Sequence, residues 1–455
     1  MPSPRETVSK WVHEGSLRLR YLSRISRAKA LRLFLRGCLA LFAVESIFNP
    51  VPANGAKRIL VIVIGGLGDC LLFDSLFRRL KERWPGARID VLTGCFESMW
   101  EQLGSLDHLM VFTPNRVKYP WSYFSFFRHI RRNQYDIVAE GIAMVPMRGI
   151  YPIFTSLVFE ASGAPVRIGR INTGRNVLLR PRKHGFKGRK EMEESALRKN
   201  SQNPTQGNPF LTHIVDLVPP DRRQYHESSR IFEPLGMLCP RQKDEPCLQP
   251  NPLTDRWASA LIQATWGSEP GVIVGVNLET THPIKAWPLE HFCSVMDQGI
   301  RDGLKFVILG LDDPHRALFQ SRYSRDDLLN LSGKTSLAQL IAVIRQCSLF
   351  LSCDTGPAHV AQACRVPTIV LFGPSNDMEF GPVDRERHTL ILPPDDLRCR
   401  PCVLGPCIRG KSCMNLISPD RVYAALAQKV LELPSKPEEC VAPVLGKSPA
   451  VLQIL

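Results

Sequence analysis

The sequence has little that would place the chain across a membrane or direct it out of the cell. Its N-terminal apolar stretch, near residues 31–42, is interrupted by Arg32 and Arg36 and followed by Glu45. That stretch is shorter than the roughly 20 apolar residues that a spanning helix needs. The same arginines break the apolar core of a signal peptide. We therefore expect neither a spanning helix nor a cleaved leader in this region.

Negative charge is also scarce. The chain has 43 Asp plus Glu against 58 Lys plus Arg, which gives a formal charge of +15. This excess favours an anionic partner such as a membrane surface, a nucleic acid or a phosphorylated substrate. No nucleic-acid-binding motif accompanies the charge, so we expect no nucleic acid. Residues 1–56 are a basic N-terminal extension, in which apolar side chains near residues 31–42 stand at helical spacing. This pattern predicts a basic amphipathic helix, which suits either an anionic membrane or the protein's own surface.

The cysteines do not form the dense framework of a small secreted protein. Most of the fourteen stand singly in apolar segments, as Cys70, Cys95, Cys347 and Cys364 do. Buried, reduced cysteines in a cytosolic protein are the simplest interpretation. Short internal repeats and low-complexity tracts are absent as well. A chain of 455 residues therefore predicts two or three ordinary globular domains.

The first domain is predicted from an apolar run, a glycine-rich turn and an amphipathic helix. Residues 59–64 have the continuous apolar character of a buried parallel strand. Gly65, Gly66 and Gly68 follow and allow a ligand to approach the backbone at the helix start. The turn lacks the full dinucleotide-binding pattern, so alone it is a weak signal. Asp69 fits either a helix-dipole partner or a proton acceptor at the mouth of a cleft.

A second alternation of strands and helices follows a linker rich in proline and charge near residues 239–255. Strands are predicted at 271–276, 305–310, 348–353 and 368–373, with helices near 289–300, 336–347 and 357–364. The domains are therefore an N-terminal extension (1–56), a Rossmann-like domain (57–245) with a polar insertion (about 183–230), a second Rossmann-like domain (246–435) and a tail (436–455). Ligands of such sheets bind beyond the carboxyl ends of the strands.

The segment SCDTGPAHVAQACRVPTIVLFGPSN, residues 352–376, begins at such a strand end. Thr355 and Gly356 would start the next helix, so their N–H groups and hydroxyl can face a diphosphate. Asp354 and His359 could hold sugar hydroxyls. An ordinary helix N-cap would also explain Asp and Thr at this position.

Four blocks in order resemble glycosyltransferase family 9, the heptosyltransferase-like enzymes of bacterial lipopolysaccharide core assembly. They are VIGGLGDCLLFDSL near residue 63, NLETTHPIKAWPLEHF at 277–292, the 352–376 segment, and CRPCVLGPCIRGKSCMNLISPDRV at 399–422. Together they span about residues 58–430. The resemblance implies an α/β fold of GT-B type, in which two facing Rossmann-like domains enclose a cleft.

The resemblance also implies roles for individual residues. Asp69 matches the general base that acts on the acceptor hydroxyl, and Lys285 matches a cation at the leaving group. Thr280 and Thr281 match the loop that grips the donor diphosphate. By the same similarity, Asp354, Thr355, Gly356 and His359 match the motif that contacts donor sugar and phosphate. Asp312 stands near the family's acidic ribose ligand, but Pro314 occupies the expected spacing, so this contact departs from the pattern.

The implied chemistry is inverting transfer of heptose from ADP-heptose by direct displacement. It needs no metal or other cofactor, because fixed positive charge replaces a divalent cation. In agreement, the sequence has no Asp-x-Asp motif in a loop suited to metal binding. The expected acceptor is an anionic lipid-linked saccharide, which places a cytoplasmic enzyme at the inner face of the cytoplasmic membrane. The alternatives are another nucleotide sugar, or a non-catalytic module that binds nucleotide sugars.

Cys399, Cys402, Cys407 and Cys413 form a compact cluster that begins with the C-x2-C spacing of zinc sites. Similar clusters recur in the family's C-terminal block, which favours a structural role. Spacing alone establishes neither a metal nor disulfides. We therefore predict a structural cluster, with zinc as the second interpretation.

Overall fold

The structure is a computed structural model in which not every residue can be described. The described residues are 55–112, 120–142, 151–169, 213–214, 232, 235, 245–312, 314–394, 397, 399–402, 407, 412–433 and 449–453. The predicted N-terminal amphipathic helix and nearly all of the 183–230 insertion lie outside these ranges. None of the described helices is long and apolar enough to cross a bilayer.

The N-terminal domain is a seven-stranded parallel sheet in the order β13-β3-β2-β1-β4-β5-β6. The strands are β1 (Arg58–Ile64), β2 (Arg88–Thr93), β3 (His108–Val111), β4 (Ile137–Ile142), β5 (Val166–Gly169), β6 (His213–Ile214) and β13 (Ala450–Gln453). The helices are α2 (Leu67–Arg83), α3 (Glu97–Trp100), α4 (Pro120–Arg132) and α5 (Tyr151–Ser162). Without β13, the order is that of a Rossmann fold, with a crossover at β1 and β4.

The C-terminal domain repeats this topology in a six-stranded parallel sheet, β12-β11-β10-β7-β8-β9. Its strands are β7 (Ile273–Asn277), β8 (Lys305–Leu309), β9 (Leu328–Asn330), β10 (Leu349–Cys353), β11 (Thr368–Leu371) and β12 (Thr389–Ile391). Its helices are α7 (Pro252–Trp266), α8 (Leu289–Arg301), α9 (Arg316–Arg322), α10 (Leu337–Gln346), α11 (Gly356–Ala363), α12 (Asp377–Phe380) and α13 (Pro419–Leu431), with 3₁₀ turns η6 (Pro283–Lys285) and η7 (Cys413–Leu416). The predicted two-domain α/β architecture of GT-B type is confirmed.

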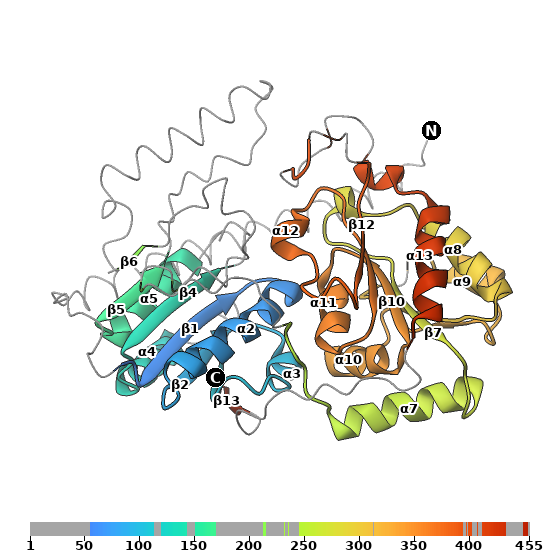
Figure 1. Cartoon of the computed structure of the whole chain (residues 1–455). Helices are drawn as coiled ribbons and strands as arrows, with labels where there is room; N and C mark the ends of the chain where they lie inside the picture. The colour runs from blue at the N-terminus through green and yellow to red at the C-terminus, as the bar shows by residue number, and fades with distance from the viewer. Residues whose placement is uncertain are drawn as a thin grey trace, which may run out of the picture.

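The strands form where the sequence has continuous apolar runs. Both faces of each sheet carry helices, so β7 and β10 are buried along their whole length. One cluster of buried apolar side chains runs from α2 through α10 and α11, so it belongs to both domains. Figure 1 shows α2 and α11 between the two sheets. The domains therefore share a core along this line.

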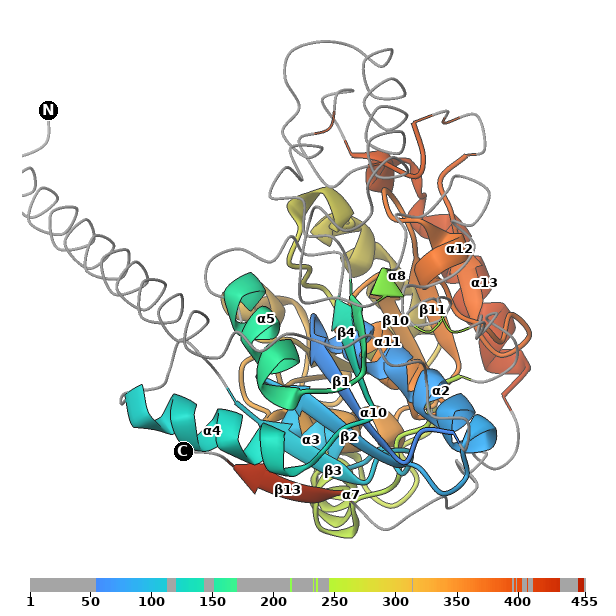
Figure 2. The same cartoon turned by 90° about the vertical axis from the view of Figure 1, so that its left-hand side faces the viewer.

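Parts of the structure differ from the sequence-based expectation. Residues 450–453, predicted to lie in a tail outside both domains, form β13, which pairs in parallel with β3 of the N-terminal domain. Figure 2 shows β13 alongside β3 below α4. Helix α7 was not predicted, although Asn251 caps it by accepting hydrogen bonds from the backbone N–H groups of Leu253 and Thr254. A strand pairing between distant segments has no local sequence signal.

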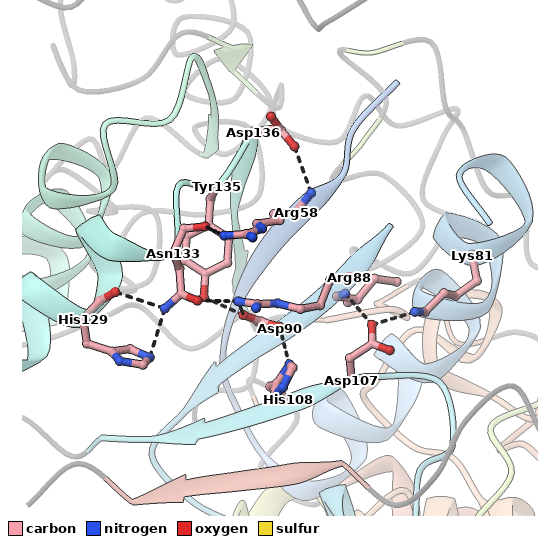
Figure 3. A network of polar contacts seen from close by, with 11 residues as sticks. Arg58, Lys81, Arg88, Asp90, Asp107, His108, His129, Asn133, Tyr135 and Asp136 are labelled. Atoms are coloured by element: carbon pink, nitrogen blue, oxygen red, sulfur yellow. Dashed lines mark hydrogen bonds and ion pairs between the residues drawn. The ribbon is translucent and has the colours of Figure 1, made fainter. Parts of the chain in front are cut away.

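A polar network lies at the amino ends of β1, β2 and β3 (Figure 3). Its centre is the buried carboxylate of Asp90, which is 2% exposed. Tyr135 Oη and Arg88 each donate to Asp90 Oδ2 at 2.6 Å, and His108 Nδ1 lies 3.1 Å from Oδ1. Burial, followed by the nearby Asp90 charge, raises the pKa of Tyr135. The network ties three strand beginnings together at the edge of the sheet away from the cleft.

Candidate functional site

The candidate site lies at the carboxyl ends of β7 and β10, where the strand order of the C-terminal sheet reverses. Asp354 follows β10 directly, and Lys285 lies in the turn after β7. Lys285 Nζ donates to Asp354 Oδ2 at 2.6 Å and lies 3.5 Å from the Asp354 carbonyl oxygen. A crossover of this kind is where open α/β sheets bind ligands. The structure therefore joins two residues that are 69 positions apart.

His359, on α11, completes this cluster. Its Nε2 lies 3.6 Å from Asp354 Oδ1. Its Nδ1 is buried and has no hydrogen-bond partner among the described residues. An unpaired polar atom of this kind costs free energy unless something pairs with it. The imidazole is therefore less fully paired than an ordinary core histidine.

The charges of this cluster are set by its burial and its partners. Burial raises the pKa of Asp354, but His359 and the Lys285 ammonium outweigh that effect and hold the pKa well below its ordinary value. Asp354 is therefore ionised at neutral pH. The Lys285 ammonium has three hydrogens, and two of them are directed at the carbonyl oxygen and Oδ2 of Asp354. The third hydrogen can therefore be donated to an anion.

The loop that carries Lys285 is held by the C-terminal block. Ser412 Oγ donates to the Ile284 carbonyl oxygen at 2.6 Å, and Trp287 Nε1 donates to the Ile417 carbonyl oxygen at 2.9 Å. Sulfur atoms of this block also pack against the loop after β11, close to Gly373. The cysteine-containing block thus supports the lysine loop from behind.

None of the four cysteines of that block forms a disulfide in the described part of the chain. Among the described residues, which include all four, no group of three or more His, Cys, Asp or Glu side chains is placed to hold a metal ion. The single cysteines at 70, 95, 347 and 364 are free as well, whereas Cys247 is disulfide-bonded. The prediction of reduced cysteines therefore fails at Cys247.

The hydroxyl of Thr355 is directed into the protein. Thr355 is the N-cap residue of α11, and its Oγ1 donates to Asn277 Oδ1 at 3.1 Å and lies 3.0 Å from Ser352 Oγ. This buried network fixes the end of β10 against the end of β7. Asn277 was not among the predicted site residues, although it is the last residue of a buried strand. The predicted contact of the Thr355 hydroxyl with a diphosphate has no support from this orientation.

The loop after β7 contains the two predicted threonines and one residue that sequence reasoning missed. Thr280 Oγ1 donates to the His282 carbonyl oxygen and accepts from the His282 N–H, while Thr281 is exposed. Glu279 accepts from the backbone N–H groups of Leu311 (2.7 Å) and Asp312 (3.0 Å). Asp312 is therefore placed by its backbone, and its side chain is exposed.

The N-terminal domain contributes the start of α2 to the same region. Asp69 is the third residue of this helix, and its Oδ2 accepts a hydrogen bond from the Gly66 N–H at 3.1 Å. Gly66 is exposed and Gly65 half-buried. At Gly68, a Cβ atom would lie 2.3 Å from His359 Cδ2, so only glycine fits. The ring of His359 thus lies against the Gly68 backbone, at the turn where the sequence predicted that a ligand approaches.

Asp69, Asp354, His359 and Lys285 therefore come together from two domains. The contact between Gly68 and His359 brings the start of α2 against the start of α11, and Asp69 follows Gly68 directly. Both helix starts carry the positive end of a helix dipole. The arrangement combines a carboxylate, a cation and N–H groups at one cleft, which suits an anionic ligand on one side and a proton acceptor on the other.

Comparison with known sequences finds a likeness in the C-terminal domain. Residues 250–411 match the family described as Glycosyltransferase family 9 (heptosyltransferase). The lipooligosaccharide heptosyltransferase 2 of Campylobacter jejuni serotype O:2 is 33% identical over 94 residues, which are 20% of this chain and 29% of that protein. The lipopolysaccharide heptosyltransferase 2 of Escherichia coli K12 is 32% identical over 119 residues, 24% of this chain and 33% of that protein. The matched regions thus span about a third of these curated relatives.

Comparison with solved structures extends the likeness to both domains. The glycosyl transferase family 9 protein from Veillonella parvula DSM 2008 has a TM-score of 0.61 at 19% identity, covering 83% of this chain and 98% of that one. The ADP-heptose lps heptosyltransferase II of E. coli has a TM-score of 0.58 at 20% identity, covering 83% and 99%. At such identities the likeness shows the fold. The predicted resemblance to glycosyltransferase family 9 is confirmed.

Proposed function

We propose that this chain, which resembles the heptosyltransferase-like proteins of glycosyltransferase family 9, transfers a sugar from a nucleoside diphosphate donor to a saccharide acceptor. The observation that carries the proposal is the Lys285–Asp354–His359 cluster, which faces the start of α2 and Asp69 across the two domains. Donor binding is assigned to the C-terminal domain and acceptor activation to the N-terminal domain.

The donor is proposed to be ADP-heptose. Solved E. coli heptosyltransferase WaaC structures contain ADP or ADP-2-deoxy-2-fluoro heptose, and their TM-scores to this chain are 0.51 and 0.52. The Lys285 ammonium and the N–H groups at the start of α11 offer the positive charge that a diphosphate requires. Another nucleotide sugar is the second candidate, since these groups recognise the diphosphate rather than the base or sugar.

The reaction is proposed to be an inverting displacement. Asp69 removes the proton of the acceptor hydroxyl as that oxygen attacks the anomeric carbon, and the bond to the diphosphate oxygen breaks. Lys285 and the α11 N–H groups stabilise the negative charge that develops on the departing nucleoside diphosphate. In this mechanism fixed positive charge of the protein, rather than a metal ion, stabilises the leaving group.

The acceptor is proposed to be an anionic glycolipid of the lipopolysaccharide core, reached from the cytoplasmic face of the inner membrane. The formal charge of +15 supports an anionic acceptor or surface. Both relatives described above are named as heptosyltransferases of lipooligosaccharide or lipopolysaccharide.

The first test is calorimetric titration of the full chain with ADP, UDP and GDP. We expect ADP to bind most tightly and the Lys285→Ala variant to bind it about tenfold to a hundredfold more weakly, because one charge-assisted contact is lost. Lys305→Ala, at the opposite end of the strands, is the matched control and should bind like the unmodified chain. Absence of binding of every nucleotide by well-folded protein would contradict the proposal.

The second test separates an enzyme from a non-catalytic binding module. Protein that has been shown to bind ADP is incubated with ADP-heptose and a truncated core glycolipid that lacks heptose. Mass spectrometry then measures the mass of the glycolipid acceptor. Gain of one heptose is the expected result. Donor binding without transfer to any core acceptor would favour the non-catalytic module.

A further inference from the structure

The segment that joins the two domains, residues 245–250, is held from both sides. From the N-terminal domain, Arg78 donates to the Glu245 carbonyl oxygen at 2.6 Å. The buried carboxylate of Asp74 pairs with Arg78 at 3.2 Å and accepts from the Cys247 N–H. From the C-terminal domain, Arg345 donates to the carbonyl oxygens of residues 248 and 249. This connection is therefore a fixed joint rather than a free linker.

The carboxylate of Glu245 is the centre of the joint. It is 1% exposed, and the partners that the described residues provide belong to the C-terminal domain. Oε2 lies 3.1 Å from His388 Nε2 and 3.5 Å from Arg365 NH1, and Oε1 accepts from the Asp384 N–H at 3.1 Å. Removing one partner of such a buried ionic cluster leaves uncompensated charge. Glu245 thus connects the two domains: its carbonyl oxygen accepts from Arg78 of the N-terminal domain, and its carboxylate is paired within the C-terminal domain.

The joint acts on the same two helices that carry the candidate site. Arg78 lies on α2, whose first turn holds Asp69. Arg365 lies two residues beyond the end of α11, whose first turn holds His359. Helices α2 and α11 pack on one another through the shared apolar cluster. If either helix shifts at the joint, its first turn, which carries Asp69 in α2 and His359 in α11, would therefore also shift at the cleft.

We propose that Glu245 is a positioning residue, which fixes α2 against α11 and so sets where Asp69 lies relative to Lys285 and Asp354. Its carboxylate is buried and paired within the protein. Its consequence for activity rests on the proposed transferase function, but its consequence for the helices does not. Misplacing a reacting group by about 1 Å can cost about a hundredfold in rate, so a loosened joint should lower the transfer rate while changing ADP affinity little.

The test compares Glu245→Gln with the unmodified chain and with Asp297→Asn, which removes a carboxylate of the half-exposed Asp297–Arg322 pair. Hydrogen exchange of the backbone is followed at residues 66–70 and 355–360. We expect about tenfold faster exchange at both helix starts in Glu245→Gln and no change in Asp297→Asn. At saturating ADP-heptose the transfer rate should fall at least about tenfold, with the ADP dissociation constant within about twofold.

A second, milder variant guards against simple unfolding. Arg365→Gln removes one partner whose side chain is 25% exposed, and it should show a smaller change of the same kind. Unchanged exchange at both helix starts in folded variants, together with an unchanged transfer rate, would overturn the proposal. If the unmodified chain transfers no sugar, the proposed function fails, and the exchange experiment still decides whether Glu245 fixes the helices.

Discussion

Two buried aspartates, Asp90 in the N-terminal domain and Asp354 in the C-terminal domain, lie at opposite ends of their strands. Asp90 is in β2 near its amino end, and Asp354 directly follows the carboxyl end of β10. Both are nearly inaccessible, at 2% and 6% exposure. Each is surrounded by basic or hydroxyl-bearing partners. Burial and charge alone would rank them equally as candidates for function.

The partners distinguish the two aspartates. Asp90 is paired with Arg88, Tyr135 and His108, which all belong to its own domain and tie strand beginnings together. Asp354 is paired with a lysine from a loop and with a histidine that packs against the other domain and keeps one buried nitrogen unpaired. Each cluster keeps one buried nitrogen unpaired, Nε of Arg88 in the first and Nδ1 of His359 in the second, so the position of the cluster decides. A cluster within one domain at the amino ends of strands favours a structural role, whereas one at the carboxyl ends, where the two domains meet, favours binding.

The largest effect is expected at Asp69. This residue lies at the start of α2, which packs against His359 of the Asp354 cluster. Asp69→Asn removes the proton acceptor but keeps the shape and can still accept a hydrogen bond from Gly66 N–H. We expect the transfer rate at saturating donor to fall about a thousandfold, within the usual range for general base catalysis. The ADP dissociation constant should stay within about twofold, as measured by calorimetry. A variant that transfers sugar at the normal rate would show that another group takes the proton.

A large effect of a different kind is expected at Asp90. Asp90→Ala leaves Arg88 and Tyr135 without their shared acceptor, which should lower the free energy of unfolding by about 2 to 3 kcal/mol. Urea denaturation gives this value. Nucleotide affinity should be unchanged, because the network lies at the other end of the sheet. Weakened ADP binding by this variant at a temperature where it is folded would break the distinction between the two clusters.

The sequence predicted the fold of the C-terminal domain well for a physical reason. Its strands and helices are regular, and each described strand from β7 to β11 except the short β9 lies within a residue or two of its predicted range. Apolar runs between turn residues signal buried parallel strands without help from distant segments. The linker near residues 239–255 was predicted, but the contacts that hold it were missed, and so was β13, because these contacts link residues far apart in the chain.

The candidate site was predicted in part. Asp354 and Lys285 were singled out from separate segments, and the structure shows that they form one ion pair. Glu279, Asn277 and Glu245 were missed, because a single carboxylate or amide after a strand or in a joining segment has no distinctive spacing. Thr355 was assigned to the ligand from its place at a helix start, but its hydroxyl orientation depends on Asn277, 78 positions away.

A smaller effect is expected when Asp354 is changed to Asn. The variant keeps the shape but removes the charge that holds Lys285 and one acceptor for ligand hydroxyls. We expect ADP to bind about tenfold more weakly, measured by calorimetry beside Asp90→Asn, which should bind normally. Tighter binding by Asp354→Asn would instead show that this carboxylate only competes with the phosphates for Lys285.

The smallest effect is the pH dependence of the stability that Asp354 contributes. Burial raises its pKa, but His359 and Lys285 together hold the pKa below its ordinary value, so the folded state binds the proton less readily than the unfolded chain. The contribution is therefore complete above the unfolded-state value of about 3.9 and declines as the pH falls through the lower value of the folded state. Urea denaturation of the unmodified chain and of Asp354→Asn at several pH values measures it. The difference in unfolding free energy should be constant from about pH 8 to 5 and shrink below about pH 4, while a difference that grows on acidification would mean that the folded state binds this proton more tightly than the unfolded chain does.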